Sequence, residues 1–297
     1  MKLVFGSILL IICNASCSQV EQDALQEKTP VASDRKGYWL NGGAEISSYE
    51  LTQARYGELH SGRAVLVFVT EPFSLEKGTK SESPTKTDVS ILKLNFTKKF
   101  NTGIYPYSMM TSTFYPYKNG EHSLKISSSS QEWCGHTYME LTNKKKFEVK
   151  LLSYFEDQSF ENLVVEKTIL EDDIWTMIRL QPQNLPEGSL KIIPSFFYLR
   201  LMHGEFQAYE CETSSKKMND STSVYSIQYP SLDRSLSIIY ETSFPHKIIS
   251  WSESYESGWG ENKKRLTTEA KLINSIRVEY WKKHSNIDNH LRSELGL

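Results

Sequence analysis

The sequence predicts a mainly β protein, built as one large antiparallel sheet that is curved or forms an open β-barrel, with one mid-chain helix and a short C-terminal helix. Aromatic residues make up 12% of the chain, with 16 Tyr and 6 Trp, and such residues favour strands. Short segments with strand-like patterns follow one another, and a helical period appears only twice. No repeat of fixed period is visible, so the sequence does not indicate a solenoid or a propeller.

The chain begins with the features of a secretory signal peptide. Lys2 precedes a short apolar run that ends at Ile12, and the small residues Ala15 and Ser16 follow. This run is too short for a permanent transmembrane helix, and no later segment has a comparable one. We therefore expect residues 1–16 to be a signal peptide and the protein to be exported.

Cys17 follows directly and is a candidate lipidation site. The stretch Ala15-Ser16-Cys17-Ser18 resembles the bacterial lipobox, although Asn14 stands where an aliphatic residue is usual. The alternative is ordinary cleavage near Ser16, which leaves Cys17 as a plain thiol. Acyl chains on Cys17 would anchor the protein to a membrane, since each buried methylene contributes about 0.8 kcal/mol.

The segment after Cys17 is polar and has no periodicity. Such a composition buries too little apolar surface to offset the entropy of ordering. We expect residues 17–36 to be a lipid anchor with a flexible tether, and residues 37–297 to be a single β-rich domain. The predicted location is the outer membrane, as a periplasmic or surface-facing lipoprotein.

The first half of the domain reads as successive strands. Residues 44–59 and the apolar run 64–69 suggest a hairpin with its turn at His60-Ser61-Gly62 and a second strand that is buried on both faces. Residues 74–88 form a polar loop, and Asn119-Gly120 is a tight-turn dipeptide. Further strands are expected at residues 90–96, 105–117, 121–128, 132–141 and 147–155.

The period changes in the middle of the chain. Residues 170–179 place Leu170, Ile174, Met177 and Ile178 on one helical face. The acidic residues of the first turn, Glu171, Asp172 and Asp173, are expected to act as partners of the helix dipole rather than as acid–base pairs. Strands are then expected at residues 189–197, 200–211, 223–229, 235–240, 247–255 and 266–279, and a terminal helix at residues 286–295.

Composition narrows the function. The net charge of −2 gives no support for nucleic-acid binding. The seven histidines lack the close spacing of common zinc motifs, so we expect no metal and no cofactor. A site assembled from distant strands, such as His136 with His203, is left open.

The stretch QEWCGHTY offers the most reactive side chains. On a strand over residues 132–141, Cys134, His136 and Tyr138 share one face, and the backbones of Cys134 and His136 lie roughly 7 Å apart. The two residues are close at this separation, but they do not make the hydrogen-bond contact that a nucleophile and its base require. Buried packing, or a disulfide between Cys134 and Cys211, is the favoured alternative, and no residue is assigned as catalytic.

A second stretch is dense in tyrosine and methionine. Tyr105 and Tyr107 precede Met109 and Met110, and such side chains can line the mouth of an apolar pocket. The alternative is core filling beside a turn set by Pro106. The residues expected to contact a ligand or to carry function are Glu132, Trp133, Cys134, His136, Tyr138, Tyr105 and Tyr107.

Several segments together resemble a known family. The stretches ISSYELTQARYGE, AVLVFVTEPF, LKLNFTKKFNTGIYPYSMM, QEWCGHTY, SYFE and LRSELGL look like an uncharacterised Bacteroidota lipoprotein family, and the resemblance extends over most of the chain from about Tyr38. In that family the WCGH segment recurs without a partner at Cys211, which argues against the disulfide. The family supplies no catalytic residues.

Members of this family often carry the label "septum formation inhibitor Maf". True Maf proteins are cytoplasmic α/β nucleotide pyrophosphatases with a Ser-x-Ser-Pro-Arg-Arg-like stretch. Here Thr85 and Lys86 replace both arginines after Ser81-Glu82-Ser83-Pro84, so the enzymatic meaning of the label does not apply.

Three functions remain in view. The first is a non-enzymatic envelope lipoprotein that binds a hydrophobic ligand, such as a lipid, or an envelope protein partner. The second is an envelope hydrolase or transferase that uses Cys134 and His136. The third is a subunit of a larger outer-membrane assembly, which the tether alone suggests.

Overall fold

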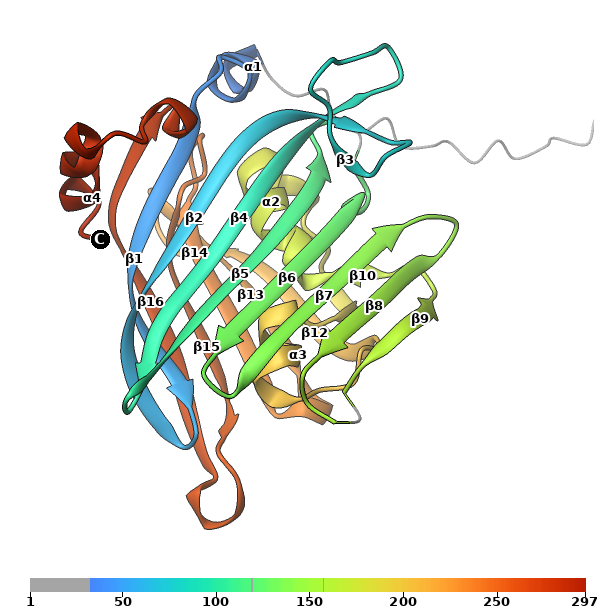
Figure 1. The fold of residues 1–297 in the computed structure, drawn as a ribbon, viewed down its shortest axis with the longest axis vertical. Helices are drawn as coiled ribbons and strands as arrows, with labels where there is room; N and C mark the ends of the chain where they lie inside the picture. Colours follow the sequence, from blue (N-terminus) through green and yellow to red (C-terminus); the bar gives the residue numbers. More distant parts are fainter. Residues whose placement is uncertain (1–32, 119, 157) are drawn as a thin grey trace, which may run out of the picture. The chain divides into compact units, whose positions relative to one another are not determined.

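The computed structural model describes residues 33–118, 120–156 and 158–297. The described residues form one large curved sheet that is not closed, together with four α-helices, so the predicted fold class is confirmed (Figure 1). The expected signal peptide and Cys17 lie outside the described residues. No helix in the described part of the chain is both long and apolar enough to cross a membrane.

The strands follow one another along the chain with few interruptions. They are β1 (Ala44–Arg55), β2 (Glu58–Ser74), β3 (Thr79–Lys80), β4 (Val89–Thr102), β5 (Tyr105–Pro116), β6 (Lys125–Glu132), β7 (Gly135–Asn143), β8 (Phe147–Ser153), β9 (Phe160–Val165), β10 (Ile169–Leu170), β11 (Gly188–Ile193), β12 (Tyr209–Lys217), β13 (Thr222–Tyr229), β14 (Arg234–Glu241), β15 (Ile248–Ser257) and β16 (Lys264–Val278).

The helices are α1 (Ser33–Trp39), α2 (Glu171–Leu180), α3 (Phe196–Met202) and α4 (His290–Glu294). Short 3₁₀ turns are η1 (Pro182–Asn184), η2 (Pro230–Leu232), η3 (Gly260–Asn262), η4 (Tyr280–Lys282) and η5 (Asn286–Asn289). Helix α1 begins at Ser33, within the segment that was expected to be a tether.

The order of strands in the sheet is almost their order in the sequence. It runs β10-β11-β12-β13-β14-β15-β16-β1-β2-β4-β5-β6-β7-β8-β9, with β3 paired only to β2. All pairs are antiparallel except the two-residue pair of β10 with β11. The strands nearest the chain ends, β1 and β16, therefore pair with each other, and the two edges of the sheet, β9 and β10, are consecutive in the chain (Figure 1).

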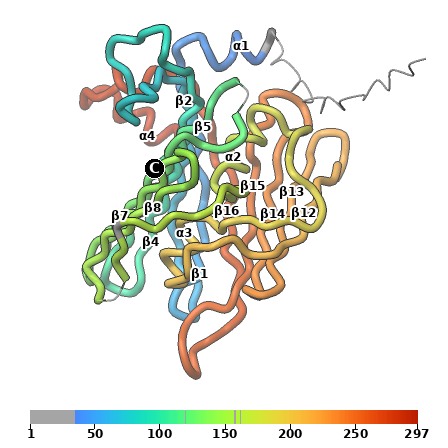
Figure 2. The backbone as a smooth tube through the Cα atoms, turned by 90° about the vertical axis from the view of Figure 1, so that its right-hand side faces the viewer, coloured from blue at the N-terminus to red at the C-terminus, as the bar shows by residue number. Residues whose placement is uncertain are grey.

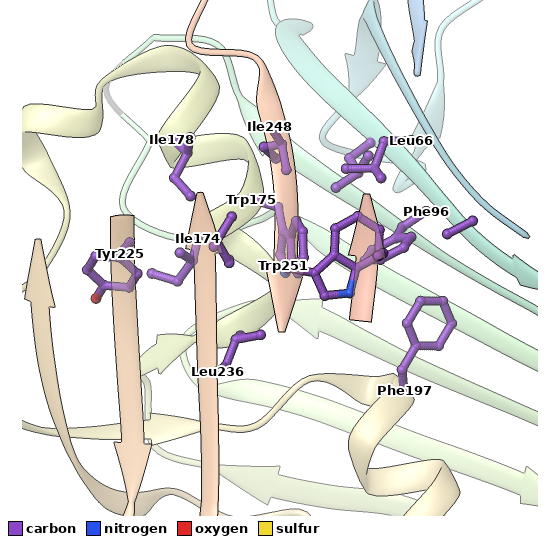
Figure 3. Packing of buried hydrophobic residues seen from close by; sticks show 14 of the residues in the cluster. Leu66, Phe96, Ile174, Trp175, Ile178, Phe197, Tyr225, Leu236, Ile248 and Trp251 are labelled. Atoms are coloured by element: carbon purple, nitrogen blue, oxygen red, sulfur yellow. The ribbon is translucent and has the colours of Figure 1, made fainter. Parts of the chain in front are cut away.

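Helices α2 and α3 lie on the concave side of the sheet (Figures 1 and 2). Aromatic side chains from the helices and the strands fill the space between them. Trp175 of α2 meets Phe96 of β4 and Trp251 of β15 edge to face, with ring centroids 5.0 and 5.2 Å apart. Phe197 of α3 packs on Phe96 from the other side at 5.1 Å (Figure 3). Such edge-to-face pairs add to the stabilisation that burial of large rings provides.

Helix α2 confirms the predicted mid-chain helix, but it is buried on almost every side rather than on one face. Its buried residues include the three acidic residues of the first turn, Glu171, Asp172 and Asp173. The prediction that these side chains are simple dipole partners missed their place in the core.

Several predicted strand boundaries are wrong. The strand predicted over residues 189–197 ends at Ile193, because α3 begins at Phe196, and the strand predicted over residues 121–128 is β6, which begins only at Lys125. The first hairpin turns at Tyr56 and Gly57, so His60–Gly62 lie within β2. Residues 64–68 of β2 alternate between buried and half-buried positions, and only at Phe68 and Val69 are two successive residues buried, so the strand is not buried on both faces along its length. The predicted strand over residues 200–211 contains the end of α3 and a loop before β12 begins. The predicted strand over residues 132–141 is interrupted by a two-residue turn, because Glu132 pairs with Gly135.

Candidate ligand-binding cavity

A cavity of ≈ 370 Å³ lies where α3 faces strands β7, β8 and β9 at one side of the sheet. Its apolar wall comes from both layers and consists of Met139, Leu151, Phe160, Leu163, Leu199 and Phe206. Polar side chains line the rest of it, among them Thr137, Gln158, Arg200 and His203. Small-molecule sites in proteins have this size and this mixture of an apolar wall with a few polar groups.

Helix α3 carries the polar side of the cavity, and its two ends are held in place. Ser195 is the N-cap, and its hydroxyl accepts a hydrogen bond from the backbone N–H of Tyr198 at 3.2 Å. The backbone N–H of Phe196 donates to a carboxylate oxygen of Asp172 at 3.0 Å. At the other end the guanidinium of Arg55 donates to the carbonyl of Leu201. The helix is thus fixed to both α2 and β1.

Arg200 is the most unusual side chain of the site. Only 7% of it is exposed, and its Nη2 donates to Oε1 of Glu132 at 2.9 Å, where the carboxylate side chain is 2% exposed. Its Nε and Nη1 are buried and have no hydrogen-bond partner, and the same holds for Oε2 of Glu132. The ring of Phe155 covers the guanidinium, with the guanidinium carbon 5.0 Å from the ring centroid. A buried donor without a partner is costly, so this group has unused binding capacity.

A second guanidinium lies next to this one, within a cluster of tyrosines. Arg55 donates to the hydroxyls of Tyr56 and Tyr107, each at 3.3 Å, and these two hydroxyls are 2.6 Å apart. The hydroxyl of Tyr105 donates to that of Tyr56 at 2.9 Å. Burial raises the pKa of Tyr107 far above its usual range, so Tyr107 is a neutral phenol beside a charged guanidinium.

The tyrosine cluster depends on a strained turn. Tyr56 has φ 57°, a left-handed conformation that bulky residues rarely adopt, and the next residue, Gly57, has φ 79°. These two positive φ values fit the tight turns that join hairpin strands. A side chain at Gly57 would lie 2.1 Å from the backbone oxygen of Asn262, so only glycine fits there.

The site carries excess positive charge. His203 is exposed as a residue, but desolvation of its ring is the main reason that its pKa falls to about 4, and the charges of Arg200 and Arg55 lower it further. His203 is therefore neutral at physiological pH. Arg200 pairs with the buried carboxylate of Glu132, whereas the partners of Arg55 are the hydroxyls of Tyr56 and Tyr107 and the carbonyl of Leu201.

Elsewhere in the core, buried arginines are fully paired. Arg234 donates from Nε to Glu253 at 2.8 Å and from Nη1 and Nη2 to the two oxygens of Glu171 at 2.5 and 2.6 Å. Arg179 holds both oxygens of Glu45 at 2.6 and 2.7 Å and donates from Nε to the carbonyl of Pro245. Bidentate pairs of this kind are the strongest ionic contacts in proteins.

The other two acidic residues of α2 lie in less compensated positions. Burial raises the pKa of Asp172 to about 8, against the opposing effect of its hydrogen bond from Phe196. Burial likewise raises the pKa of Asp173 to about 7, and this carboxyl accepts from the hydroxyl of Ser123 at 2.6 Å and from its backbone N–H at 3.1 Å. These contacts tie α2 to the neighbouring loops.

The structure separates the residues that the sequence singled out. Glu132 is buried and binds Arg200 beside the cavity, and Tyr105 and Tyr107 belong to the Arg55 cluster. Trp133 is 68% exposed in the turn between β6 and β7, where it stacks on Tyr105 with centroids 6.3 Å apart.

Cys134, His136 and Tyr138 lie away from the cavity. Cys134 is an exposed free thiol in the same turn as Trp133, and Cys211 is a buried free thiol in β12, so no disulfide joins them. His136 and Tyr138 alternate along β7 with Thr137, which lines the cavity, and so they face the opposite side of the sheet. The hydroxyl of Tyr138 donates to Glu140 at 2.6 Å.

Sequence reasoning missed Arg200 as a site residue, and it weighed His203 only as a partner of His136 in a metal site. Both residues lie in the segment 200–211 that was predicted as a strand. His203 lines the cavity on one side of β7, whereas His136 points to the other side of that strand. The usable signal was a single arginine within the apolar stretch Phe196–Met202, because a charge at such a position needs a buried partner. Within the described residues, no group of three or more His, Cys, Asp or Glu side chains is placed to hold a metal ion.

Comparisons with known proteins add no relative. No family model matches the chain, and neither a curated protein nor a solved structure matches it. The function is therefore inferred from the cavity and its residues.

Proposed function

We propose that this protein is a cell-envelope lipoprotein that works as a binding module for a hydrophobic ligand, with the cavity between α3 and β7–β9 as its site. The observation that carries the proposal is the apolar wall of this cavity, to which four separate elements contribute. A cavity of ≈ 370 Å³ is at the lower end of the range for small-molecule sites, about 300–1,000 Å³. Anchoring through Cys17, and membership of the lipoprotein family that the sequence resembles, belong to the same proposal.

Most of the concave side of the sheet is already filled. The aromatic residues around Trp175 and Trp251 pack directly on the sheet, and α2 is buried among them. A ligand that occupied the whole concave side would have to displace this core. The cavity beside α3 needs no such rearrangement, which favours a single short apolar chain over a large lipid.

The test uses the mature chain and a pair of variants at adjacent residues of β8. Leu151 lines the cavity, whereas Leu152 is 45% exposed and points to the other side of the strand. Leu151→Trp fills the cavity and should abolish binding of dodecanol, measured by displacement of the fluorescent probe N-phenylnaphthylamine. Leu152→Trp introduces the same ring outside the cavity and should bind like the wild type. Equal binding by both variants would show that this cavity is not the site.

A further inference from the structure

We infer that the ligand of this cavity is an amphipathic anion, an apolar chain that ends in a carboxylate or phosphate group held by Arg200. This inference rests on the proposed function, since it assigns the chemistry of the head group to the same cavity. Arg200 lines the cavity, and only 7% of its side chain is exposed. Two of its three guanidinium nitrogens have no hydrogen-bond partner.

The unpaired nitrogens of Arg200 are themselves buried, so a ligand meets them only when the guanidinium turns into the cavity that the residue lines. They then determine the kind of atom that the ligand must present. A guanidinium has donors only, so its partner must be a hydrogen-bond acceptor. Nε carries one hydrogen and Nη1 carries two, and the single contact of the group, from Nη2 to Glu132, uses neither nitrogen. An oxygen-bearing head group with several lone pairs matches this set of donors.

The charges around the cavity favour a negative head group over a neutral one. Arg200 binds the carboxylate of Glu132, and the charge of Arg55 acts on Arg200 from nearby. The exposed His203 is neutral because desolvation of its ring and the charges of these two arginines lower its pKa. Glu205 also lines the cavity, but it is exposed and accepts a hydrogen bond from Gln207 at 2.9 Å. One negative charge from the ligand would balance the buried groups, and charge-assisted hydrogen bonds are about twice as strong as neutral ones.

The apolar wall meets the charged group along α3. Leu199 and Arg200 are neighbours on this helix and both line the cavity, and Met139, Phe160 and Leu163 face them from the sheet. A chain lying along this wall would bring its polar end to the guanidinium. The cavity thus combines the two halves of an amphipathic ligand in one place.

The experiment compares three probes of equal chain length on the mature protein: laurate, dodecyl phosphate and dodecanol. The inference predicts that an anion binds at least about tenfold more tightly than dodecanol, which is the effect of one charge-assisted hydrogen bond. Whichever anion binds more tightly identifies carboxylate or phosphate as the head group. Equal affinity for all three probes would overturn the inference while leaving the proposed function intact, whereas failure of all three to bind would count against both.

The role of Arg200 is tested with a double variant that removes the buried pair together. Glu132→Gln with Arg200→Met leaves no unpaired charge, and it should bind dodecanol like the wild type but lose the tighter binding of the anions. If the anions keep their advantage in this variant, Arg200 is not the group that holds them.

A measurement on the wild type keeps the inference falsifiable if the double variant does not fold. In nitrogen-labelled protein the Nε–H resonance of Arg200 should shift when laurate binds and should shift far less with dodecanol. The Nε–H resonance of Arg234, whose nitrogens are all paired, serves as the internal control. An Arg200 signal that responds equally to both probes contradicts the inference.

Discussion

Two buried arginines define two different regions of this molecule. In the centre, Arg234 has a carboxylate partner for each of its three guanidinium nitrogens, from Glu171 on α2 and Glu253 on β15. Toward the β9 edge of the sheet, Arg200 has one carboxylate contact, two nitrogens without a partner and a cavity beside it. Both side chains are almost completely buried, at 1% and 7% exposure.

The difference separates a structural ion pair from a binding group. Desolvation of a charge costs several kcal/mol, and only a complete set of partners offsets it. The centre meets this condition, which fixes α2 against the sheet. The Arg200 region does not meet it, so part of the desolvation cost is left for a ligand to offset.

The largest effect is expected at the centre. Arg234→Met leaves the carboxylates of Glu171 and Glu253 buried without their partner and should lower the free energy of unfolding by about 3–5 kcal/mol. The measurement is urea denaturation followed by tryptophan fluorescence. A loss below about 1 kcal/mol would show that the paired arginine does not stabilise the core.

Asp172 provides the next effect, through pH. Its pKa is about 8 in the folded protein and about 3.9 in the unfolded chain, so the unfolded chain releases its proton first and the contribution of Asp172 to stability is lost as pH rises toward 8. Asp172→Asn removes this loss, so the free energy of unfolding of the variant should be higher than that of the wild type by about 2 kcal/mol near pH 8.

The difference in unfolding free energy between Asp172→Asn and the wild type separates this effect from other titrating groups. His203, whose pKa is lowered, gives the opposite pH dependence, but it is present in both proteins and cancels in their difference. The measurement is denaturation of both proteins at about pH 5 and at about pH 8, both within the range between the unfolded and the folded pKa of Asp172. A difference that does not grow with pH would contradict the raised pKa of Asp172.

A smaller effect is expected from removing the incomplete pair. Glu132→Gln with Arg200→Met replaces an ion pair that leaves three polar atoms unpaired, and such replacements are often close to neutral. The free energy of unfolding without ligand should change by less than about 1 kcal/mol. A loss as large as that of Arg234→Met would make the two regions equivalent and would remove the distinction drawn above.

The smallest effect concerns the aromatic cover of Arg200. Phe155→Leu keeps the apolar volume but removes the ring that lies 5.0 Å from the guanidinium carbon, and it should cost about 0.5–1 kcal/mol of stability. Thermal denaturation measures the change. An unchanged melting temperature would mean that the ring does not stabilise the charge.

The sheet and two of the helices could be predicted because they follow simple periodicities. The acidic start of α2 and the spacing of its apolar residues identified that helix, and the segments between turn residues identified most strands. Helix α3 was missed because Phe196–Met202 is apolar and aromatic at every position except Arg200, and such a short run is also typical of a buried strand. The turn at Trp133 and Cys134 was missed because neither residue is a usual turn former.

The candidate site was only partly visible for a different reason. Glu132 was selected from its neighbours in the sequence, but its partner Arg200 belongs to another element, and nothing local connects the two. The cavity forms only when α3 is placed against β7, β8 and β9, and that arrangement is a property of the topology. Tyr105 and Tyr107 were expected near a pocket mouth. Both contact the cluster around Arg55, which anchors the helix that lines the cavity, and Tyr107 also lines a separate hollow with Phe100 and Pro106.

The pairing of β1 with β16 has a consequence for how the chain acquires its structure. Every other antiparallel pair joins strands that are close in sequence, whereas Ala44 must meet Val278 across nearly the whole domain. Closing so long a loop is entropically expensive and slow, and a ribosome makes β1 first and β16 last. The edge of β1 therefore stays unpaired until β16 has been synthesised, and a chaperone that covers this edge would protect the chain most during that interval.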